Sequence, residues 1–404
     1  MPSSRELSPA VLGALSAVSG LRLGTPCEAV PQPIAEAVTR LSSMFNRGRV
    51  AEGLPYLEEP SLRAAYLTYF FPVNLVKGQV LLDEAEPVLA LRAGEPFRVL
   101  DVGGGPGTGA LALLDWLSSR SNEDRQAVEC TVIDHSPKAL RLCEGLWREY
   151  RSERSAAGPR NLHTIVCDLE KRLPRGLFDD PTHPAYDLIL VQNVLSELYL
   201  RQAETIEKRT ALVEALLHRL SPQGTLILIE PALRSVSREL HLVRDRLLQQ
   251  SSCTVYSPCL HEHQCPALVK PDDWCHEERG WIRPEWIEQV DRTVGFIKDA
   301  LKFSYLILRK DGKTLVPRSS DLHRVVSELR VMKGEKRVWW CDETGRPEVG
   351  RLDRERSPSN AVFDDWHRGA IVRVSEIVRK ERKGRPGTVG RIPASATAEI
   401  VRPI

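Results

Sequence analysis

The sequence lacks any run of about 18 apolar residues, the length that a membrane-spanning helix requires. It also lacks a strong charge of either sign, because 56 Lys and Arg oppose 54 Asp and Glu and leave a net charge of +2. Binding to nucleic acid must therefore come from local basic patches. The first 20 residues have no basic lead and no clear cleavage site, so we expect neither a signal peptide nor a transit peptide.

Internal repeats are also absent, and a length of 404 residues predicts two or three domains. The content of 42% hydrophobic and 27% charged residues is ordinary for a soluble globular protein. Nine cysteines are an odd number in a chain without a secretion signal. This fits a reducing compartment, with thiols that are free or bound to metal, better than a disulfide framework.

The N-terminal region, residues 1–95, is predicted to be helical. Apolar residues recur at helical spacing between Pro33 and Phe45 and again between Leu75 and Leu91. The aromatic-rich segment Leu62–Phe71 is expected to end at Pro72, because proline disfavours a continuing helix.

From residue 96 the pattern changes to short apolar strands that alternate with helices. Strands are predicted at Phe97–Val102, Cys130–Ile133, Leu162–Val166, Tyr186–Gln192 and Gly224–Ile229. This alternation predicts an α/β domain over 96–310, with a parallel sheet covered by helices on both faces, as in a Rossmann-like fold.

The rest of the chain departs from this pattern. A cysteine-rich insert is expected at 251–281, a late strand at Phe303–Leu308, a small β module at 311–376 and a flexible basic tail at 377–404.

A glycine-rich turn follows the first predicted strand directly and reads Asp101-Val-Gly103-Gly-Gly105-Pro-Gly107. Glycine lets the chain turn tightly and lets a ligand approach the backbone without a Cβ in the way. The helix that follows offers free N–H groups to a polar or anionic group. Taken alone, the motif also fits a purely structural turn.

Two acidic residues close the next strands. Asp134 ends the second strand, where a carboxylate can accept both hydroxyls of a ribose, and Asp168 follows the third, near the adenine or ribose rim. The order Asp-x-Gly-x-Gly-x-Gly resembles motif I of the Rossmann-like S-adenosylmethionine methyltransferases, in which the acidic residue, here Asp101, faces the amino-acid end of the cofactor. A dinucleotide-binding fingerprint is the weaker alternative, because its nearest match, Gly105–Ala110, is shifted into the helix.

The fourth strand ends in Gln192-Asn193-Val-Leu-Ser196-Glu197, where methyltransferases usually place catalytic groups. This segment lacks the Asn-Pro-Pro-Tyr motif of amino-group methylation and the Pro-Cys pair of a pyrimidine-carbon nucleophile. Asn193 and Glu197 could orient a substrate, although Glu197 also fits a helix-start carboxylate. The catalytic residues therefore stay unassigned. The predicted cofactor-binding residues are Asp101, Gly103, Gly105, Gly107, Asp134, Asp168 and Asn193.

Four cysteines crowd into one loop-like stretch: Cys253, Cys259, Cys265 and Cys275. Several thiolates on one loop indicate a soft-metal site, either tetrahedral zinc or an iron–sulfur cluster. The spacing lacks the Cys-x-x-Cys knuckle usual for zinc, whereas His261, His263 and His276 keep zinc as the alternative. Apart from Cys341 near the end of the chain, the cysteines outside this loop are expected to be buried or structural: Cys27, Cys130, Cys143 and Cys167.

The segments Ser257-Pro-Cys259-Leu-His261, Cys265-Pro266, Asp273-Trp-Cys275-His276 and Lys302-Phe-Ser-Tyr305 resemble one family. It is the methyltransferase-like assembly-factor family of the small ribosomal subunit, whose mitochondrial members are known as methyltransferase-like protein seventeen and which has bacterial relatives. The resemblance extends from about residue 60 to 375 and includes the glycine turn, Leu195-Ser-Glu-Leu198 and Glu230-Pro231.

The resemblance implies binding of S-adenosylmethionine, a four-cysteine iron–sulfur cluster, and association with the small ribosomal subunit and its RNA. By position, the implied ligands are Cys259, Cys265, Cys275 and the late Cys341, while Cys253 is left to packing. A cluster on these residues would pin the β module to the methyltransferase core. The implied location is the cytoplasm of a bacterium or the mitochondrial matrix of a eukaryote, and we expect a monomer without membrane contact.

Three functions remain open. One is an RNA-directed methyltransferase-like protein, which the glycine turn and Asp134 favour. Another is a catalytically silent RNA-binding scaffold, which the plain fourth-strand motif favours. The third is a zinc-containing methyltransferase of another substrate. We expect the β module and the tail to bind the RNA, because the tail contains a local run of basic residues: Arg379-Lys380, Arg382-Lys383 and Arg385.

Overall fold

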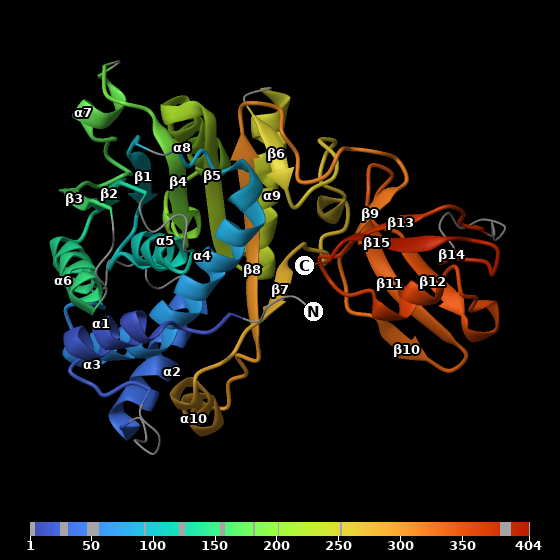
Figure 1. Cartoon of the computed structure of the whole chain (residues 1–404), viewed down its shortest axis with the longest axis horizontal. Helices are drawn as coiled ribbons and strands as arrows, with labels where there is room; N and C mark the ends of the chain where they lie inside the picture. The colour runs from blue at the N-terminus through green and yellow to red at the C-terminus, as the bar shows by residue number, and fades with distance from the viewer. Residues whose placement is uncertain are drawn as a thin grey trace.

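A mostly parallel sheet forms the centre of the larger of two lobes (Figure 1). The computed structural model describes residues 5–24, 31–46, 56–92, 94–120, 126–153, 158–180, 182–200, 202–250, 253–379 and 389–403. The sheet contains β1 (Phe97–Val102), β2 (Val128–Asp134), β3 (Arg160–Val166), β4 (Tyr186–Gln192), β5 (Leu220–Pro231), β6 (Thr254–Ser257), β7 (Glu277–Gly280) and β8 (Ala300–Arg309).

The strand order is β3-β2-β1-β4-β5-β8-β6, and β7 pairs with the start of β8. The first five strands are parallel, whereas β8 runs antiparallel to β5. The order turns back between β1 and β4, which is where ligands of doubly wound sheets bind. This topology confirms the predicted Rossmann-like α/β fold.

Helices cover both faces of this sheet. They are α5 (Thr108–Ser118), α6 (Pro137–Glu153), α7 (Arg175–Phe178), α8 (Thr205–Arg219) and α9 (Arg234–Gln249). Successive residues of β1 point to opposite cores: Val99 packs with α5 and α6, and Leu100 packs with α8 and α9. Burial on both faces explains the nearly continuous apolar strands.

The N-terminal helices share the first of these cores. They are α1 (Pro9–Ser19), α2 (Gln32–Asn46), α3 (Pro60–Ala65) and α4 (Phe71–Ala85). Helices α1 to α3 lie with α10 (Glu285–Val294) near the carboxyl ends of the parallel strands, whereas α4 crosses the face of the sheet (Figure 1). The described part of the predicted helical region is therefore helical, but it is not a separate core.

The expected helix end at Pro72 is wrong. A π-helical turn, Tyr66–Phe70, connects α3 to α4, so the helical backbone continues from Pro60 through Pro72 to Ala85. Pro72 lies in the first turn of α4, where a residue without an N–H is tolerated. The π turn before Pro72 accommodates the hydrogen bond that is lost because proline has no N–H.

The smaller lobe is a second, mainly antiparallel sheet. It contains β9 (Leu322–Val325), β10 (Arg330–Met332), β11 (Glu335–Cys341), β12 (Glu348–Leu352), β13 (Ile371–Val374), β14 (Gly390–Arg391) and β15 (Ala398–Arg402). The order is β14-β12-β11-β9-β13-β15, with β10 paired to β11. Its core is built around Trp340, Phe363 and Trp366.

The expectation of a flexible tail after residue 377 is wrong for residues 389–403. β14 pairs with β12 and β15 pairs with β13, and Ile392 is fully buried in the core of the smaller lobe. Apolar residues at Ile392, Ala396 and Ile400 supply the burial that holds this segment. Most of the expected basic run, residues 380–388, lies outside the described residues.

Short 3-10 turns complete the chain at Glu86–Val88, Leu195–Glu197, Pro266–Leu268, Asp353–Glu355 and Ala361–Asp365. Among the described residues, no helix is both long and apolar enough to cross a membrane.

We expect Ile392→Ala to destabilise the smaller lobe by about 2–5 kcal/mol, because it leaves a cavity among buried side chains. Val331→Ala is the control: this side chain is 72% exposed, so its loss should change stability by less than about 0.5 kcal/mol. Denaturant unfolding of both variants measures the difference. Equal stability of the two would contradict the placement of the C-terminal segment in this core.

Candidate functional site

The glycine turn leaves the end of β1 with backbone angles that favour glycine. Gly103 has φ +61° and Gly107 has φ +84°. A Cβ at Gly103 would lie 2.6 Å from the Cγ2 atom of Val194, and one at Gly107 would overlap the Sγ atom of Cys143. The turn therefore packs tightly against the segment after β4 and against α6, and α5 starts at its end with Thr108.

Asp101 lies beneath this turn. Its carboxylate is 1% exposed and accepts the N–H of Ala110 at 2.9 Å, in the first turn of α5. Burial raises the pKa of Asp101 to about 7, and the nearby Asp134 adds to this effect. The side chain therefore supports the turn and the helix start from below.

Asp134 binds the turn from the side. One carboxylate oxygen accepts the N–H of Gly105 at 2.9 Å, and the other accepts the N–H of Ser136 at 2.8 Å. The structure thus brings together the turn and the end of β2, as the sequence predicts. Beside them, Asp168 is 42% exposed at the end of β3, where its ion pair with Lys171 lowers its pKa.

The segment after β4 is fixed by a buried carboxylate that the sequence analysis did not single out. Glu230, at the end of β5, accepts the N–H groups of Val194, Leu195 and Ser196 at 3.1, 2.8 and 3.3 Å. Asn193 precedes them in the left-handed region, with φ 58°, and donates its N–H to Ile229. These hydrogen bonds join the ends of β4 and β5, which are far apart in the sequence. The motif Glu230-Pro231 was the only feature of the sequence that indicated them.

Glu197, just after β4, is open to solvent. Surrounding protein atoms nevertheless raise the pKa of Glu197 to about 8, and the charges of Glu230 and Asp134 add to the shift. A protonated carboxyl at this place can donate a hydrogen bond, which an ionised one cannot.

Two tyrosines from the N-terminal region meet the same edge. The rings of Tyr56 and Tyr66 lie 5.6 Å apart between centroids, and both phenols are close enough to Glu197 and Asp134 for their charges to interact. Burial raises the pKa of Tyr66 to about 12, while Thr108 and Asn74 lie beside its hydroxyl. The aromatic-rich pattern of this helical segment was visible in the sequence, but not its contact with the sheet.

The four cysteines implied as ligands come together at the junction of the lobes. Burial raises the pKa of the Cys341 thiol, and the nearby thiols of Cys275, Cys259 and Cys265 raise it further. Burial and the thiols of Cys259 and Cys275 do the same to Cys265. Three of the four belong to the insert of the larger lobe, and Cys341 ends β11 of the smaller lobe.

The other cysteines lie apart from this group. Cys130 and Cys143 are buried in the first core, Cys253 packs against the second, and Cys167 follows β3. The eight cysteines of the described chain are free of disulfides, and Cys27 lies outside the described residues. Within those same residues, no three His, Cys, Asp or Glu side chains are grouped closely enough to hold a single metal ion.

Two buried guanidinium groups flank the four thiols. Arg244 of α9 donates to the carbonyls of His261 and His263 at 2.6 and 2.9 Å. Although burial opposes its charge, Cys259, Asp245 and Cys265 raise the pKa of Arg244.

Arg346 of the smaller lobe also lies beside the four thiols. It donates to the Asp273 carboxylate at 2.6 Å, and Cys275, Asp273 and Cys341 raise its pKa against the effect of burial. The Nε–H groups of Arg244 and Arg346 are buried and have no partner among the described residues.

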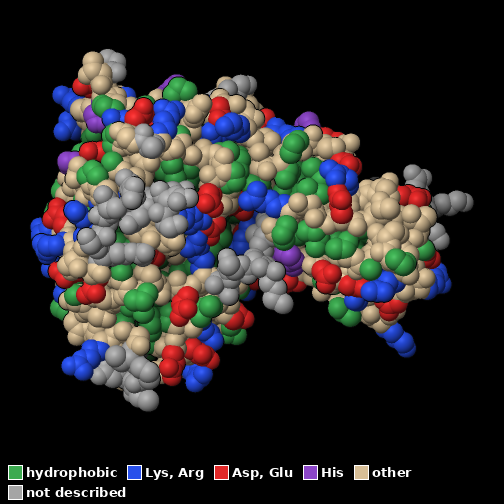
Figure 2. Space-filling model, viewed as in Figure 1, with side chains coloured by type: hydrophobic (Ala, Val, Ile, Leu, Met, Phe, Trp, Pro, Cys, Tyr) green, Lys and Arg blue, Asp and Glu red, His purple; other side chains and the backbone are tan. Residues whose placement is uncertain are grey.

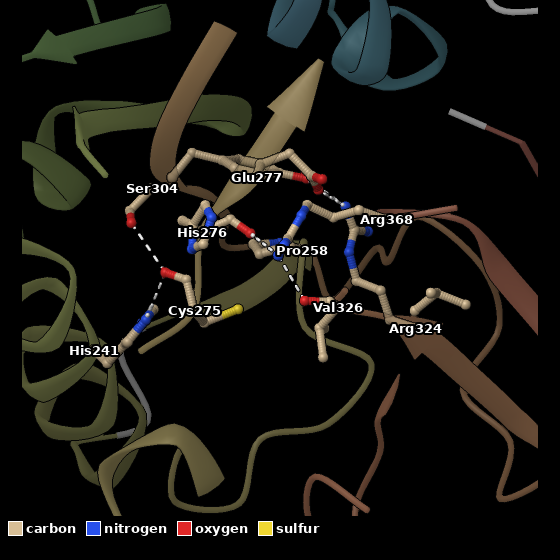
Figure 3. A pocket seen from close by; sticks show the side chains of 11 residues that line it. His241, Pro258, Cys275, His276, Glu277, Ser304, Arg324, Val326 and Arg368 are labelled. Carbon is tan, nitrogen blue, oxygen red and sulfur yellow. Dashed lines mark hydrogen bonds and ion pairs between the residues drawn. The ribbon is translucent and has the colours of Figure 1, made fainter. Parts of the chain in front are cut away.

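A small cavity beside these thiols marks the seam between the lobes (Figure 3). The Cys275 carbonyl accepts the Ser304 hydroxyl at 3.0 Å and lies 3.2 Å from the Nε2 atom of His241. Across the cavity, Arg324 of β9 donates to Glu277 at 2.6 Å. Side chains of both lobes therefore hold the cysteine region in place.

Comparison with known proteins gives distant likenesses to methyltransferases and to larger enzymes. Probable polyketide synthase 38 of Dictyostelium discoideum is 24% identical over 231 residues, which are 54% of this chain and 6% of that protein. Probable polyketide synthase 27 of the same organism is 23% identical over 52% of this chain and 7% of its own length. The chain thus spans only a small part of these relatives.

The solved structures are more distant in sequence. Magnesium protoporphyrin IX methyltransferase from Synechocystis PCC 6803 is 12% identical, with coverage of 70% of this chain and 99% of its own and a TM-score of 0.33. An S-adenosylmethionine-dependent methyltransferase from Agrobacterium tumefaciens is 18% identical over 43% of this chain and 49% of its own, with a TM-score of 0.30.

A family model gives the more extensive match. The model is described as mitochondrial small ribosomal subunit Rsm22, and it matches residues 63–351. This range contains the whole glycine turn, all strand ends of the site and the four gathered cysteines. Because the match covers well over half of the chain, the protein belongs to the mitochondrial small ribosomal subunit Rsm22 family.

Proposed function

We propose that this protein binds S-adenosylmethionine at the carboxyl edge of its sheet and acts on the RNA of the small ribosomal subunit, with an iron–sulfur cluster at the lobe junction. The observation that carries the cofactor proposal is the bond of Asp134 to Gly105, because it joins a carboxylate and a glycine turn at the switch point. The family match supports association with the small subunit.

The cofactor site would use the predicted residues in different ways. Asp134 is placed to accept ribose hydroxyls, Asp168 lies at the exposed rim, and the turn from Gly103 to Gly107 offers close backbone approach. The Thr108 hydroxyl is buried at the helix start, beside the hydroxyl of Tyr66. Asn193 would contact the cofactor from the end of β4, and Asp101 would position the turn.

The four gathered thiols fit a resident iron–sulfur cluster by their chemistry. Thiolates are the ligands that such clusters use, and four of them would leave a site with net negative charge. The unpartnered Nε–H groups of Arg244 and Arg346 supply positive charge and spare donors beside them. When bound, the cluster would supply a covalent tie between the lobes.

Zinc remains the alternative occupant. A tetrahedral zinc site places sulfurs on the order of 3.8 Å apart, as a Zn–S bond of about 2.3 Å requires. The described residues contain no group close enough for a single ion. The iron, sulfide and zinc content of the purified protein therefore decides between the two occupants.

A catalytically silent scaffold is the second candidate function. Glu230 holds the segment after β4 by three backbone bonds, which leaves Glu197 as its acidic group open to solvent. Transfer of labelled methyl from the cofactor to small-subunit RNA distinguishes the two functions. On either, we propose that the protein works as a monomer in the mitochondrial matrix, or in the cytoplasm of a bacterium.

We expect Asp134→Ala to weaken S-adenosylmethionine binding by about 1–3 kcal/mol, because two hydrogen bonds to ribose are lost. Isothermal titration of the full chain measures this. Glu129→Ala is the matched control, since Glu129 lies on the same strand near its opposite end and is exposed. If the folded wild-type protein binds no S-adenosylmethionine at millimolar concentration, the proposal of a working cofactor site is wrong.

We expect Ser replacement of Cys259, Cys265, Cys275 or Cys341 to remove visible absorption and iron from anaerobically purified protein. Stability should fall with it, because metal ligation is coupled to folding. Cys253→Ser should keep the full iron and sulfide content. Stoichiometric zinc without iron or sulfide in the wild-type protein would rule the cluster out.

A further inference from the structure

One helix of the larger lobe contacts every loop that joins the three cysteines of the insert. This helix, α9, carries polar residues along the side that is turned toward the insert: Ser237, Arg238, His241, Arg244 and Asp245. Their spacing places them in neighbouring turns of one helix face. Figure 1 shows α9 on the side of the larger lobe that is nearest to the smaller lobe.

The loop between Cys265 and Cys275 is folded around Arg238. The guanidinium of Arg238 lies within hydrogen-bond distance of four backbone carbonyls of this loop: those of Ala267 at 2.9 Å, Leu268 at 3.3 Å, Lys270 at 2.7 Å and Asp273 at 2.7 Å. Several carbonyl oxygens directed at one point is the arrangement by which proteins bind hard cations. Here the cation is a side chain of the protein itself.

The loop between Cys259 and Cys265 is held by the next turns of the same helix. Arg244 donates to the carbonyls of His261 and His263, and the Asp245 carboxylate accepts the N–H of Cys265 at 2.9 Å. Because Arg244 and Cys265 are buried, water does not compete for these hydrogen bonds.

The third cysteine, Cys275, is held through its carbonyl oxygen. The Nε2 atom of His241 lies 3.2 Å from this oxygen, and the hydroxyl of Ser304 donates to it (Figure 3). Ser304 belongs to β8, and its hydroxyl oxygen lies 2.6 Å from that of Ser237 on α9. Both serines are buried, so this contact joins the helix and the sheet behind the cysteine.

The smaller lobe also reaches these loops. Arg346 donates to the Asp273 carboxylate and the Trp274 carbonyl at 2.6 and 3.2 Å, and the Sγ atom of Cys341 lies 3.7 Å from the Nε2 atom of His261. Figure 2 shows that the two lobes meet over a narrow region beside a notch in the surface. Within the described residues, the insert is therefore held mainly by its own lobe.

We propose that α9 holds Cys259, Cys265 and Cys275 in their ligand positions in the metal-free protein, and that Arg238 is the main positioning residue. The inference rests on the proposed function, because it takes the gathered thiols as metal ligands. The hydrogen bonds from α9 to the loops leave the sulfur atoms free, so they form without metal and persist when thiolates bind it. Metal then enters a site whose backbone is already ordered, which lowers the entropy cost of ligation.

The first test is hydrogen exchange of the full-length protein, measured by mass spectrometry before and after a chelator removes the metal. The N–H groups of Leu268, Val269 and Asp273 donate within the loop, so their exchange reports its order. They should stay protected in the metal-free wild type. In metal-free Arg238→Ala they should exchange about tenfold faster or more, because hydrogen bonds from a charged donor are lost.

Unchanged exchange in β1 and β5 shows that each variant is folded. If the loop of the metal-free wild type exchanges as fast as that of Arg238→Ala, the metal orders the loop and the proposal is overturned.

The second test is the rate at which anaerobically purified, full-length protein releases bound iron or zinc to a chromogenic chelator. Arg238→Ala should release metal about tenfold faster or more, for the same reason. Arg238→Lys should restore part of the wild-type rate, because an ammonium group donates to as many as three of the carbonyls. Equal release rates from wild type and Arg238→Ala, or no difference between the Lys and Ala variants, would overturn the role of Arg238.

Arg234→Ala is a matched control. Arg234 lies one turn before Arg238 on the same helix and is exposed, so the variant removes the same charge without touching the loop. It should match the wild type in exchange and in metal release. Equal effects of Arg234→Ala and Arg238→Ala would assign the change to the charge of the helix and overturn the proposal.

The two experiments also separate this inference from the proposed function. If the purified protein holds neither iron nor zinc, the proposed metal site is wrong, while hydrogen exchange still decides whether Arg238 orders the loop. If metal is present and Arg238→Ala leaves exchange unchanged, the metal site stands and the role of α9 is wrong.

Discussion

A buried network of paired charges holds the two lobes together, and the arrangement of both proposed sites depends on it. Arg324 of β9 binds Glu277 at 2.6 Å and the Tyr305 hydroxyl at 3.0 Å, Arg279 bridges Glu277 and Glu84, and Tyr305 donates to Glu84 at 2.7 Å. All five side chains are less than 9% exposed. Removing one partner from such a network leaves an uncompensated charge in a dry interior, at a cost of about 3–5 kcal/mol. The network also fixes positions beyond itself. Arg324 faces Cys341 in the strand register, and Glu277 follows Cys275 by two residues. Glu84 belongs to α4, whose Asn74 carbonyl accepts the side chain of Gln192 at the end of β4.

The features that could be predicted from the sequence are those formed by residues close together in the chain. Strand, glycine turn and helix follow one another between Phe97 and Ser118, so the turn could be placed and Asp134 expected beside it. The crowding of Cys259, Cys265 and Cys275 could be seen directly, although the choice of Cys341 came from a family resemblance and not from spacing. Its position among the other thiols depends on a β11–β9 pairing that joins residues far from the insert.

Features formed by distant segments escaped prediction. Glu230 binds residues 34 to 36 positions earlier in the chain, and Tyr56 and Tyr66 reach Glu197 from a helical region without a site motif. Arg244 and Arg346 looked like ordinary charged residues, because nothing local shows that folding buries them beside thiols. The residues after 388 looked like a tail because their short apolar runs form strands only when β12 and β13 are present to pair with them. The continuation of the helix through Pro72 has the same origin, since tertiary packing of α4 outweighs a local preference to stop.

The contact between Gly107 and Cys143 restricts which residues can occupy two positions that are 36 residues apart. No Cβ fits between the turn and the sulfur, and the positive φ of Gly107 would strain any side chain there even if residue 143 were smaller. Conversely, a bulkier residue at 143 would push the turn away from α6. During divergence of the family, glycine should therefore be kept at 107, and residue 143 should stay no larger than cysteine. A relative that has lost this pairing has released the turn from its support, and its glycine pattern is then free to drift.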